Sequence, residues 1–250
     1  MTTSQQWIEH FQANAKEQRI NWSITPTLSN HELETILPSL QAWQLGETSD
    51  GHHLLAASSQ YACRINDPHY VKAVKLFIKE EQKHGGNLGR YLDLISKPRI
   101  SSDWGDTLFR KIRYYNTSME LWTLAVITVE STAQVFYQSL KDATCCPLLK
   151  QICTDILIDE AYHIQFQTER LYILFEGRGR LRKWFFGMFY TLFFYCTSLV
   201  VWMAHKKVFK AGGNSFMDYF KKMDLKYRKT VGRIVQPTHL NSESYSKHPA

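Results

Sequence analysis

Residues Asp159-Glu160-Ala161-Tyr162-His163 lie inside an apolar run that extends from Leu148 to about Leu174. Glu160 and His163 are three positions apart, so in a helix they project from one face. A carboxylate and an imidazole together bind divalent metals such as iron, manganese or zinc. A single Glu-x-x-His is common by chance, so this stretch alone does not establish a metal site.

The same pattern occurs a second time, at Glu80-Glu81-Gln82-Lys83-His84. Here too, an acid directly precedes the glutamate of the motif. Four-helix bundles that hold two metals take one Glu from each of two helices and a Glu-x-x-His from each of the other two. The repeated motif therefore predicts such a bundle, provided that two further single glutamates lie in the middle of helices.

Glu47 and Glu130 meet this condition. Glu47 shares an apolar seam with Trp43 in a helix that we expect from Pro38 to about Ala62. Glu130 is the only charged residue from position 122 to 137, in a long helix expected to begin after Ser102 or Asp103. Glu47 lies 34 residues before the first motif glutamate, and Glu130 lies 30 before the second. Each spacing suits one helix, a connection and the return of an antiparallel partner.

These side chains are all expected among apolar neighbours. An unpaired buried carboxylate costs on the order of several kcal/mol, so chains keep one where a metal or another partner compensates. The alternative is a helical scaffold whose acids pair with Lys or Arg. We favour two metal ions, held by Glu47, Glu81, His84, Glu130, Glu160 and His163.

The two motifs resemble those of the ferritin-like di-iron carboxylate superfamily. Glu80-Glu81-x-x-His84-Gly85, followed by Tyr91-Leu92, is similar to the equivalent stretch of the soluble acyl-carrier-protein desaturases. Asp159-Glu160-x-x-His163 resembles the last metal helix of those desaturases, of the bacterial multicomponent hydrocarbon monooxygenases and of the arylamine N-oxygenases. Glu130-Ser131-Thr132-Ala133 also fits the third metal helix. The resemblance covers roughly residues 38 to 175.

This resemblance implies an all-α fold, a ferritin-like antiparallel four-helix bundle with additional C-terminal helices. It implies two iron ions, with manganese as an alternative in one or both positions. It also implies that Glu80 and Asp159 accept hydrogen bonds from ligand histidines across the bundle, although both could equally be solvated helix acids. The arylamine N-oxygenases have a further histidine one turn before the last motif. Ile156 occupies that position here, so a seven-ligand site is not expected.

Two ferrous ions bridged by carboxylates can reduce O2, while the protein supplies geometry and a dry pocket. The 75 residues after residue 175 are rich in aromatics, which favours oxidation of an apolar or carrier-linked small molecule over iron storage. No dinucleotide-binding or iron–sulfur spacing is present, so electrons would come from a separate donor, unless peroxide is used directly. Hydroxylation, desaturation and N-oxygenation remain open. The rival class is a ferroxidase or iron-binding protein without an organic substrate.

The net charge of +7 comes largely from Lys and Arg after residue 177. A basic region suits an acidic carrier protein or an anionic membrane surface, or it is an ordinary solvated face. Nucleic acid is not expected, because no zinc-finger, RNA-recognition or basic-zipper pattern is present. The five cysteines lack a pairing pattern and the first 30 residues lack an apolar core. We therefore expect a cytoplasmic protein, or one peripheral to the inner membrane, with a homodimer as a further expectation.

The sequence divides into four predicted regions. Residues 1–37 form an N-terminal extension with a short helix, to which we assign no chemistry, and residues 38–176 form the bundle. Residues 177–235 contain an apolar helix and a basic amphipathic helix, packed on the bundle or on a membrane, and residues 236–250 form a disordered tail. The apolar helix includes Trp184 to Ala204, 21 residues without a formal charge. It could be a buried fifth helix, an interfacial helix or a single span, and we expect His205 after it to be an interfacial cation.

Overall fold

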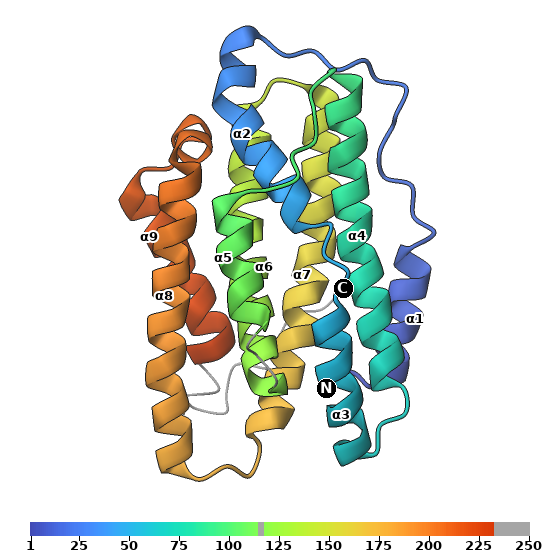
Figure 1. Cartoon of the computed structure of the whole chain (residues 1–250), viewed down its shortest axis with the longest axis vertical. Coiled ribbons are helices and arrows are strands. Elements are labelled where there is room, and N and C mark those ends of the chain that lie inside the picture. Colours follow the sequence, from blue (N-terminus) through green and yellow to red (C-terminus); the bar gives the residue numbers. More distant parts are fainter. Residues whose placement is uncertain (115–117, 233–250) are drawn as a thin grey trace, which may run out of the picture.

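Two long helices carry the repeated motifs and lie at the centre of the structure: α4 (Tyr70–Leu94) and α7 (Pro147–Phe175). The computed structural model describes residues 1–114 and 118–232, and within these residues it contains helices and no strands. Helix α6 (Met119–Ala143) packs along α7, and α2 and α3 pack against α4 (Figure 1). The predicted fold class is confirmed.

The prediction of one helix from Pro38 to about Ala62, which would carry Glu47, is wrong. The structure has two helices in this region. Helix α2 (Asn30–Gly46) begins earlier, because the Ser29 hydroxyl and the Glu32 carboxylate cap it reciprocally, and Pro38 lies in its interior. After a break, α3 (His52–Ile65) follows. Gly51, with φ +64°, lies at this break, and a Cβ there would approach a side-chain carbon of Ile78 to 2.5 Å. A glycine is therefore required where the chain turns.

The predicted third metal helix is also divided. Helix α5 (Trp104–Tyr114) precedes α6 as a separate element, and the Ser118 hydroxyl accepts a hydrogen bond from the Leu121 N–H at the start of α6. The expected continuous helix from Ser102 or Asp103 is therefore wrong. Helix α5 lies in front of α6 in Figure 1 and does not extend it.

The N-terminal region is part of the bundle's packing. Helix α1 (Ser4–Asn14) lies along α4, and its Trp7 and Phe11 are buried against Phe166 of α7. Residues after α1 run without regular structure to the start of α2 (Figure 1). The segment is therefore held on the two helices that carry the motifs.

Helix α8 (Arg180–Ala211) lies along α6 and α2, and α9 (Phe216–Tyr227) packs on α8 before a π-helical turn at Arg228–Gly232. By length and composition α8 could cross a membrane, and 33% of its most apolar window is buried inside the protein. Hydrogen bonds from Tyr190 to the Glu120 carbonyl of α6 and from Tyr195 to Asp224 of α9 hold it against the bundle. The predicted disordered tail, residues 236–250, lies outside the described residues.

Candidate metal centre

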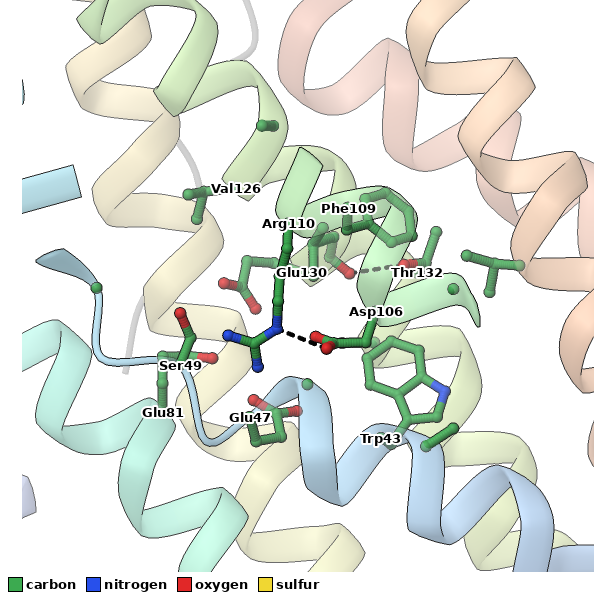
Figure 2. A pocket seen from close by; sticks show the side chains of 18 of the residues that line it. Trp43, Glu47, Ser49, Glu81, Asp106, Phe109, Arg110, Val126, Glu130 and Thr132 are labelled. Carbon is green, nitrogen blue, oxygen red and sulfur yellow. Dashed lines mark hydrogen bonds and ion pairs between the residues drawn. The ribbon is translucent and has the colours of Figure 1, made fainter. Parts of the chain in front are cut away.

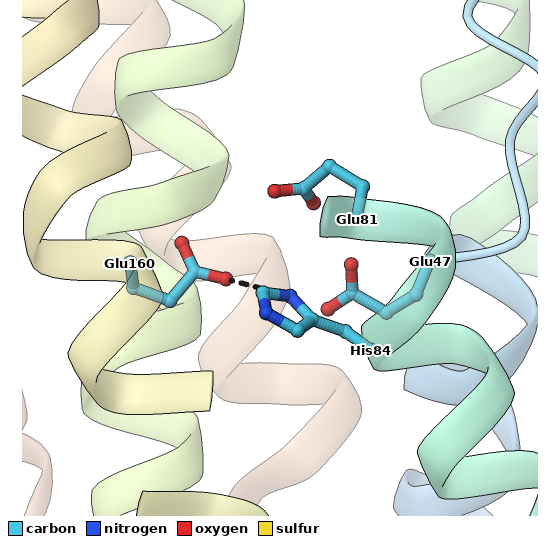
Figure 3. A group of neighbouring side chains, drawn as sticks. All are labelled: Glu47, Glu81, His84 and Glu160. Carbon is cyan, nitrogen blue, oxygen red and sulfur yellow. Dashed lines mark ion pairs between the residues drawn. The ribbon is translucent and has the colours of Figure 1, made fainter. Parts of the chain in front are cut away.

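The six predicted ligand residues come together between α2, α4, α6 and α7. Glu47, Glu81, His84 and Glu160 form one group, and Glu81, Glu130, Glu160 and His163 form a second. Within each group, one oxygen or nitrogen atom of every residue lies within 4.8 Å of the others. Figure 3 shows the first group. Glu81 and Glu160 belong to both groups. The structure thus presents two adjacent four-residue sites joined by two shared carboxylates.

Each histidine of the cluster uses one ring nitrogen to contact a carboxylate on the opposite helix. His84 Nε2 of α4 lies 3.0 Å from Asp159 Oδ2 of α7, and His163 Nε2 of α7 lies 2.9 Å from Glu80 Oε2 of α4. Carboxylates accept hydrogen bonds at neutral pH, so each Nε2 donates to its carboxylate. His84 Nδ1 and His163 Nδ1 lie 3.6 Å from the two different oxygens of Glu160. The Nδ1 atoms of both rings therefore face the cluster.

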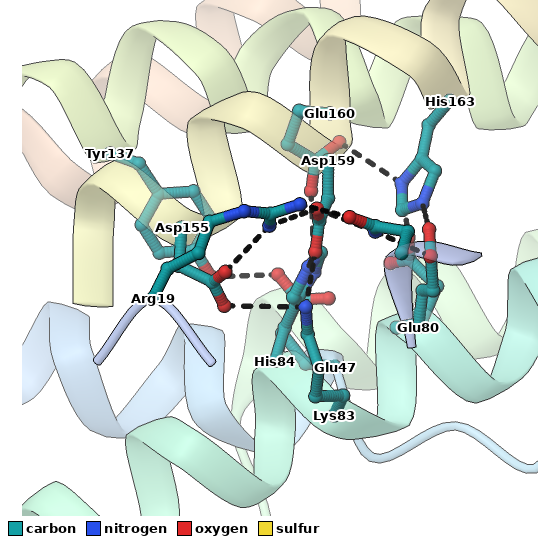
Figure 4. A network of polar contacts seen from close by, with 12 residues as sticks. Arg19, Glu47, Glu80, Lys83, His84, Tyr137, Asp155, Asp159, Glu160 and His163 are labelled. Carbon is teal, nitrogen blue, oxygen red and sulfur yellow. Dashed lines mark hydrogen bonds and ion pairs between the residues drawn. The ribbon is translucent and has the colours of Figure 1, made fainter. Parts of the chain in front are cut away.

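Asp159 is the most heavily bonded of these carboxylates (Figure 4). Besides His84, it contacts Lys83 Nζ at 2.5 Å and Arg19 Nη1 at 2.9 Å. The same two cations also reach Asp155, at 3.3 and 2.8 Å. Although burial of Asp159 opposes ionisation, His84 and Lys83 lower the pKa of its carboxyl far below the usual range. Asp159 is therefore ionised and fixed in position.

Asn14, from the end of α1, joins the two carboxylates. Its side-chain amide donates to Glu80 Oε1 at 2.6 Å and to Asp159 Oδ1 at 2.9 Å, while its carbonyl oxygen accepts from Arg19. The sequence prediction assigned no chemistry to residues 1–37 and therefore missed Asn14 and Arg19. No motif marks them, because they reach α4 and α7 only in the folded chain.

The carboxylates of the cluster repel one another. Burial, together with the neighbouring Glu81 and Glu160, raises the pKa of Glu47 well above the usual range, and burial and the same neighbours act likewise on Glu130. Burial also opposes ionisation of Glu81, yet the adjacent imidazole of His163 lowers the pKa of Glu81 to about 2. Burial opposes the charged form of His163 as well, but Glu81 raises the pKa of its imidazole well above the usual value.

The residues fit two divalent cations. The buried atoms without a hydrogen-bond partner include both carboxylate oxygens of Glu160 and the Nδ1 atoms of His84 and His163, and all of them face the cluster. His163 Nδ1 lies 2.7 Å from Glu81 Oε1, but without hydrogen-bond geometry. Unpartnered buried polar atoms are costly, and an ion would satisfy all of them together. Four carboxylates in the cluster also match the charge of two divalent ions.

Glu47 reaches the cluster from the break between α2 and α3. Its Oε1 accepts a hydrogen bond of 2.7 Å from the Tyr137 hydroxyl of α6. A Cβ at Gly85 of α4 would lie 3.1 Å from the Glu47 carbonyl carbon, so the glycine allows the two backbones to approach closely. The glycine that follows His84 in the motif thus has a packing role.

A cavity of about 460 Å³ opens directly onto the cluster (Figure 2). Its polar floor includes the carboxylate-bearing residues Glu47, Glu81 and Glu130. Its walls are largely apolar, and they come from α2, α3, α4, α5, α6 and α8. The apolar wall residues include Trp43, Phe77, Ile78, Phe109, Trp122, Val126, Val129, Ala133, Phe193 and Val201. A pocket of this size and lining suits a small apolar molecule.

Arg110 and His205 are among the charged or titratable residues that line the cavity without having been predicted to do so. Arg110 of α5 projects toward the carboxylates in Figure 2, and its Nε donates to Asp106 at 2.5 Å, which offsets its charge. His205 lines the cavity, contacts the Ser39 hydroxyl at 3.0 Å through Nδ1 and interrupts the helical geometry of α8. Burial lowers the pKa of His205 to about 4. The expectation of an interfacial cation at this position is wrong.

No protein-family model and no curated protein matches the chain. Solved structures do match it across nearly the whole length. An R2-like ligand-binding oxidase variant with an anaerobically reconstituted Mn/Fe cofactor aligns with 16% identity and a TM-score of 0.67, over 92% of this chain and 94% of that one. Another variant, with an aerobically reconstituted Fe/Fe cofactor, aligns with 16% identity and a TM-score of 0.67, over 92% and 93%.

The chain has the fold of the R2-like ligand-binding oxidases. A third structure of this group, with an aerobically reconstituted Mn/Fe cofactor, gives 17% identity and a TM-score of 0.66 over 92% of this chain and 93% of that one. Identities this low show the shared architecture and leave the chemistry to be argued from the residues. Each of these alignments covers more than nine-tenths of both chains, which is more than the central bundle alone.

Proposed function

We propose that this protein is a non-haem di-metal oxidase that uses O2, or peroxide, to oxidise an apolar or carrier-linked small molecule. One observation carries the proposal: three carboxylates of a six-residue metal-ligand cluster form the floor of an apolar cavity. A storage or scaffold protein has no need for such a cavity above its metal ligands. The cofactors named for the R2-like oxidase structures add support.

In this proposal two iron ions, or iron and manganese, are held by Glu47, Glu81, His84, Glu130, Glu160 and His163. Glu81 and Glu160 are the shared ligands, because they belong to both groups. Metal ions held by these residues would supply the redox chemistry that O2 activation requires. Iron and manganese both suit a mixed imidazole and carboxylate set.

The protein's own residues position the substrate and control water. The apolar wall excludes water and holds a hydrocarbon portion above the carboxylates. The Tyr137 hydroxyl fixes the orientation of Glu47, and Asp159 and Glu80 fix the orientation of the two imidazoles. Electrons come from a separate donor protein in this proposal, because no dinucleotide-binding motif occurs in the sequence. Carrier-linked substrates would dock through the basic residues that follow residue 177.

The first experiment measures metal per chain in protein from iron-supplemented culture. The parent should hold about two ions, the number that such bundles bind. The Glu160→Ala/His163→Ala variant should lose both, since it removes a shared ligand and an imidazole. His31→Ala/Glu34→Ala is the matched control, because these residues have the same spacing on α2 and are both exposed. A parent that binds no iron after anaerobic ferrous reconstitution contradicts the proposal.

A second experiment separates oxidation of an organic molecule from simple ferroxidase activity. Val126 lines the cavity and is absent from the ligand cluster, so Val126→Trp fills the cavity and leaves the ligands in place. Substrate-dependent O2 consumption should fall strongly in this variant, while oxidation of added ferrous iron continues. If no apolar compound stimulates O2 consumption and Val126→Trp changes nothing, the ferroxidase alternative is correct.

A further inference from the structure

Helix α8 has an apolar face that points away from the bundle. Large apolar side chains on it stay exposed at intervals of three, four or seven residues, which are one or two helical turns: Leu181 (77%), Phe185 (61%), Met188 (51%), Leu192 (66%), Leu199 (41%) and Met203 (55%). This spacing places them on one side of the helix over about 33 Å. The residues that face the bundle, such as Tyr190, Phe194 and Val201, are buried. Figure 1 shows α8 at the outer edge of the molecule. An exposed apolar surface of this length indicates an interaction site.

The ends of this face are basic. Arg180, Arg182 and Lys183 lie at its start, and Lys206, Lys207 and Lys210 lie at its end. Between residues 178 and 211 the sequence contains no Asp or Glu. Of the nearby acids, Asp218 caps α9 and Asp224 contacts Tyr195 and Arg228. The cations of α8 therefore remain available to an anionic partner.

Charge argues against a second copy of the chain as that partner. A two-fold dimer brings the same patch of both chains together. With the two α8 helices antiparallel, the basic start of one meets the basic end of the other. With the helices parallel, each basic end meets its own copy. Both arrangements place like charges together, which costs binding energy.

The attachment of α8 to the bundle argues against a span across a bilayer. Tyr190 donates to the Glu120 carbonyl of α6, and the Thr191 and Tyr227 hydroxyls lie 2.6 Å apart. The Tyr219 hydroxyl of α9 donates to the Ser198 carbonyl. One side of α8 is thus committed to the protein along most of its length, and only the opposite side is open.

We propose that α8 is a membrane-docking helix that lies flat on an anionic bilayer, with its outward apolar face in the headgroup region and its terminal lysines and arginines on lipid phosphates. A helix with an apolar face and basic residues binds membranes through both contributions. Trp184 and Phe189, which are also exposed, add aromatic side chains of the kind that favour this interface. This inference stands independently of the oxidase activity.

The test is flotation of the purified full-length protein with vesicles. Vesicles of equal parts phosphatidylglycerol and phosphatidylcholine should carry the protein upward, and vesicles of phosphatidylcholine alone should bind it at least about tenfold more weakly. Rising salt should release it. Phe185→Glu/Leu192→Glu should abolish binding. The matched control, Leu94→Glu/Tyr172→Glu, changes exposed apolar residues on α4 and α7 and should bind as the parent does.

A lysine series tests the electrostatic contribution. Lys206→Gln/Lys207→Gln/Lys210→Gln should weaken binding to the anionic vesicles by about fivefold or more, because each basic residue near the surface contributes. The control, Lys72→Gln/Lys75→Gln/Lys79→Gln, removes three exposed lysines from α4 and should have no effect. Circular dichroism and metal content show whether each variant remains folded.

Three outcomes would overturn the proposal. The parent protein could ignore both kinds of vesicle, or it could bind both equally. Alternatively, light scattering could show a dimer in solution that Phe185→Glu/Leu192→Glu dissociates, in which case a second copy covers the face. Vesicle binding and oligomeric state are both measured on the parent protein as well as on the variants, so a poorly folded variant does not change the conclusion.

Discussion

The two Glu-x-x-His turns consist of the same residue types, but their surroundings differ in charge (Figure 4). On the His84 side, the supporting carboxylate of Asp159 is held by two cations, Arg19 and Lys83. On the His163 side, Glu80 accepts from the neutral amide of Asn14 besides the imidazole itself. Lys83 precedes His84 directly, whereas the residue before His163, Tyr162, is 41% exposed.

This difference teaches that a repeated motif need not give two equal sites. A carboxylate held by two cations fixes its imidazole more firmly than one held by an amide. We therefore expect the metal beside His84 to be bound more tightly than the metal beside His163. Unequal positions also provide a basis for holding two different metals, as in the Mn/Fe structures that share this fold.

The largest effect expected concerns the shared carboxylates. Glu160→Gln removes a ligand from both groups and should reduce the metal content from about two ions per chain to nearly none. Glu47→Gln and Glu130→Gln each change one group and should leave about one ion. Elemental analysis of the purified proteins measures this directly. Equal losses in all three variants would show that the two groups do not act as separate sites.

Metal removal should destabilise the whole protein. A metal at a thousandfold excess over its dissociation constant stabilises the folded state by about 4 kcal/mol, which corresponds to roughly 10 °C in melting temperature for a chain of this size. Scanning calorimetry of the loaded and chelated protein gives the difference. Unchanged melting would mean that the cluster carboxylates are satisfied without a metal. The exposed pair variant, His31→Ala/Glu34→Ala, should shift like the parent.

The next prediction compares the two supporting carboxylates. Asp159→Asn removes the buried carboxylate that His84, Lys83 and Arg19 share, and it leaves the two cations with Asp155. It should lower the free energy of unfolding by about 2–3 kcal/mol. Glu80→Gln removes a charge that no Lys or Arg contacts and should cost about 1–2 kcal/mol. Each should also weaken metal binding by about 10- to 100-fold. Urea unfolding and metal titration measure the two effects, and a larger cost for Glu80→Gln would reverse the assigned difference.

Asn14 should give an effect on stability no larger than that of Glu80→Gln. Asn14→Ala removes two hydrogen bonds to buried carboxylates and should cost about 1–2 kcal/mol. Since Asn14 contacts the supporting acids of both histidines, both metal affinities should fall together. Asn21→Ala, at an exposed position on the same segment, is the control. A loss confined to one metal would assign Asn14 to that side alone.

The central part of the fold was predictable because the helical spacing of apolar residues and the Glu-x-x-His motifs occur in the same stretches of sequence. Helix α7 begins and ends within one residue of the apolar run from Leu148 to about Leu174, since apolar residues recur at helical spacing around its Glu-x-x-His. The all-α architecture follows from the repetition. The six cluster residues were found by the same logic, because ligands on parallel or antiparallel helices must lie at one level of the bundle.

The errors have physical causes. Pro38 was read as the first turn of a helix, but the capping pair Ser29 and Glu32 starts α2 earlier and the helix continues through the proline. The predicted helix from Pro38 to about Ala62 includes the run from Gly46 to Gly51, whose poor helix formers end α2 instead. His205 was placed at an interface because charge and position favour that, while tertiary packing buries it.

The N-terminal contacts could not be predicted, because they join residues that are far apart in the sequence. The Asn14 amide contacts Asp159, 145 positions away, and the Thr2 backbone N–H donates to Glu169, 167 positions away. Contacts at such separations leave no periodic signal. They depend on the complete arrangement of α1, α4 and α7.

The position of Asn14 also sets the order of events when the protein is made. During synthesis the amino-terminal segment emerges first, but its partner Asp159 is added 145 residues later. At the usual speed of translation that interval is about 7 to 30 seconds. The hydrogen bonds from Asn14 to Glu80 and Asp159 therefore form only after α7 has emerged and packed against α4. A nascent chain that meets iron before this point lacks Asp159, Glu160 and His163, which are all on α7. We therefore expect the metal centre to assemble only after α7 has been made.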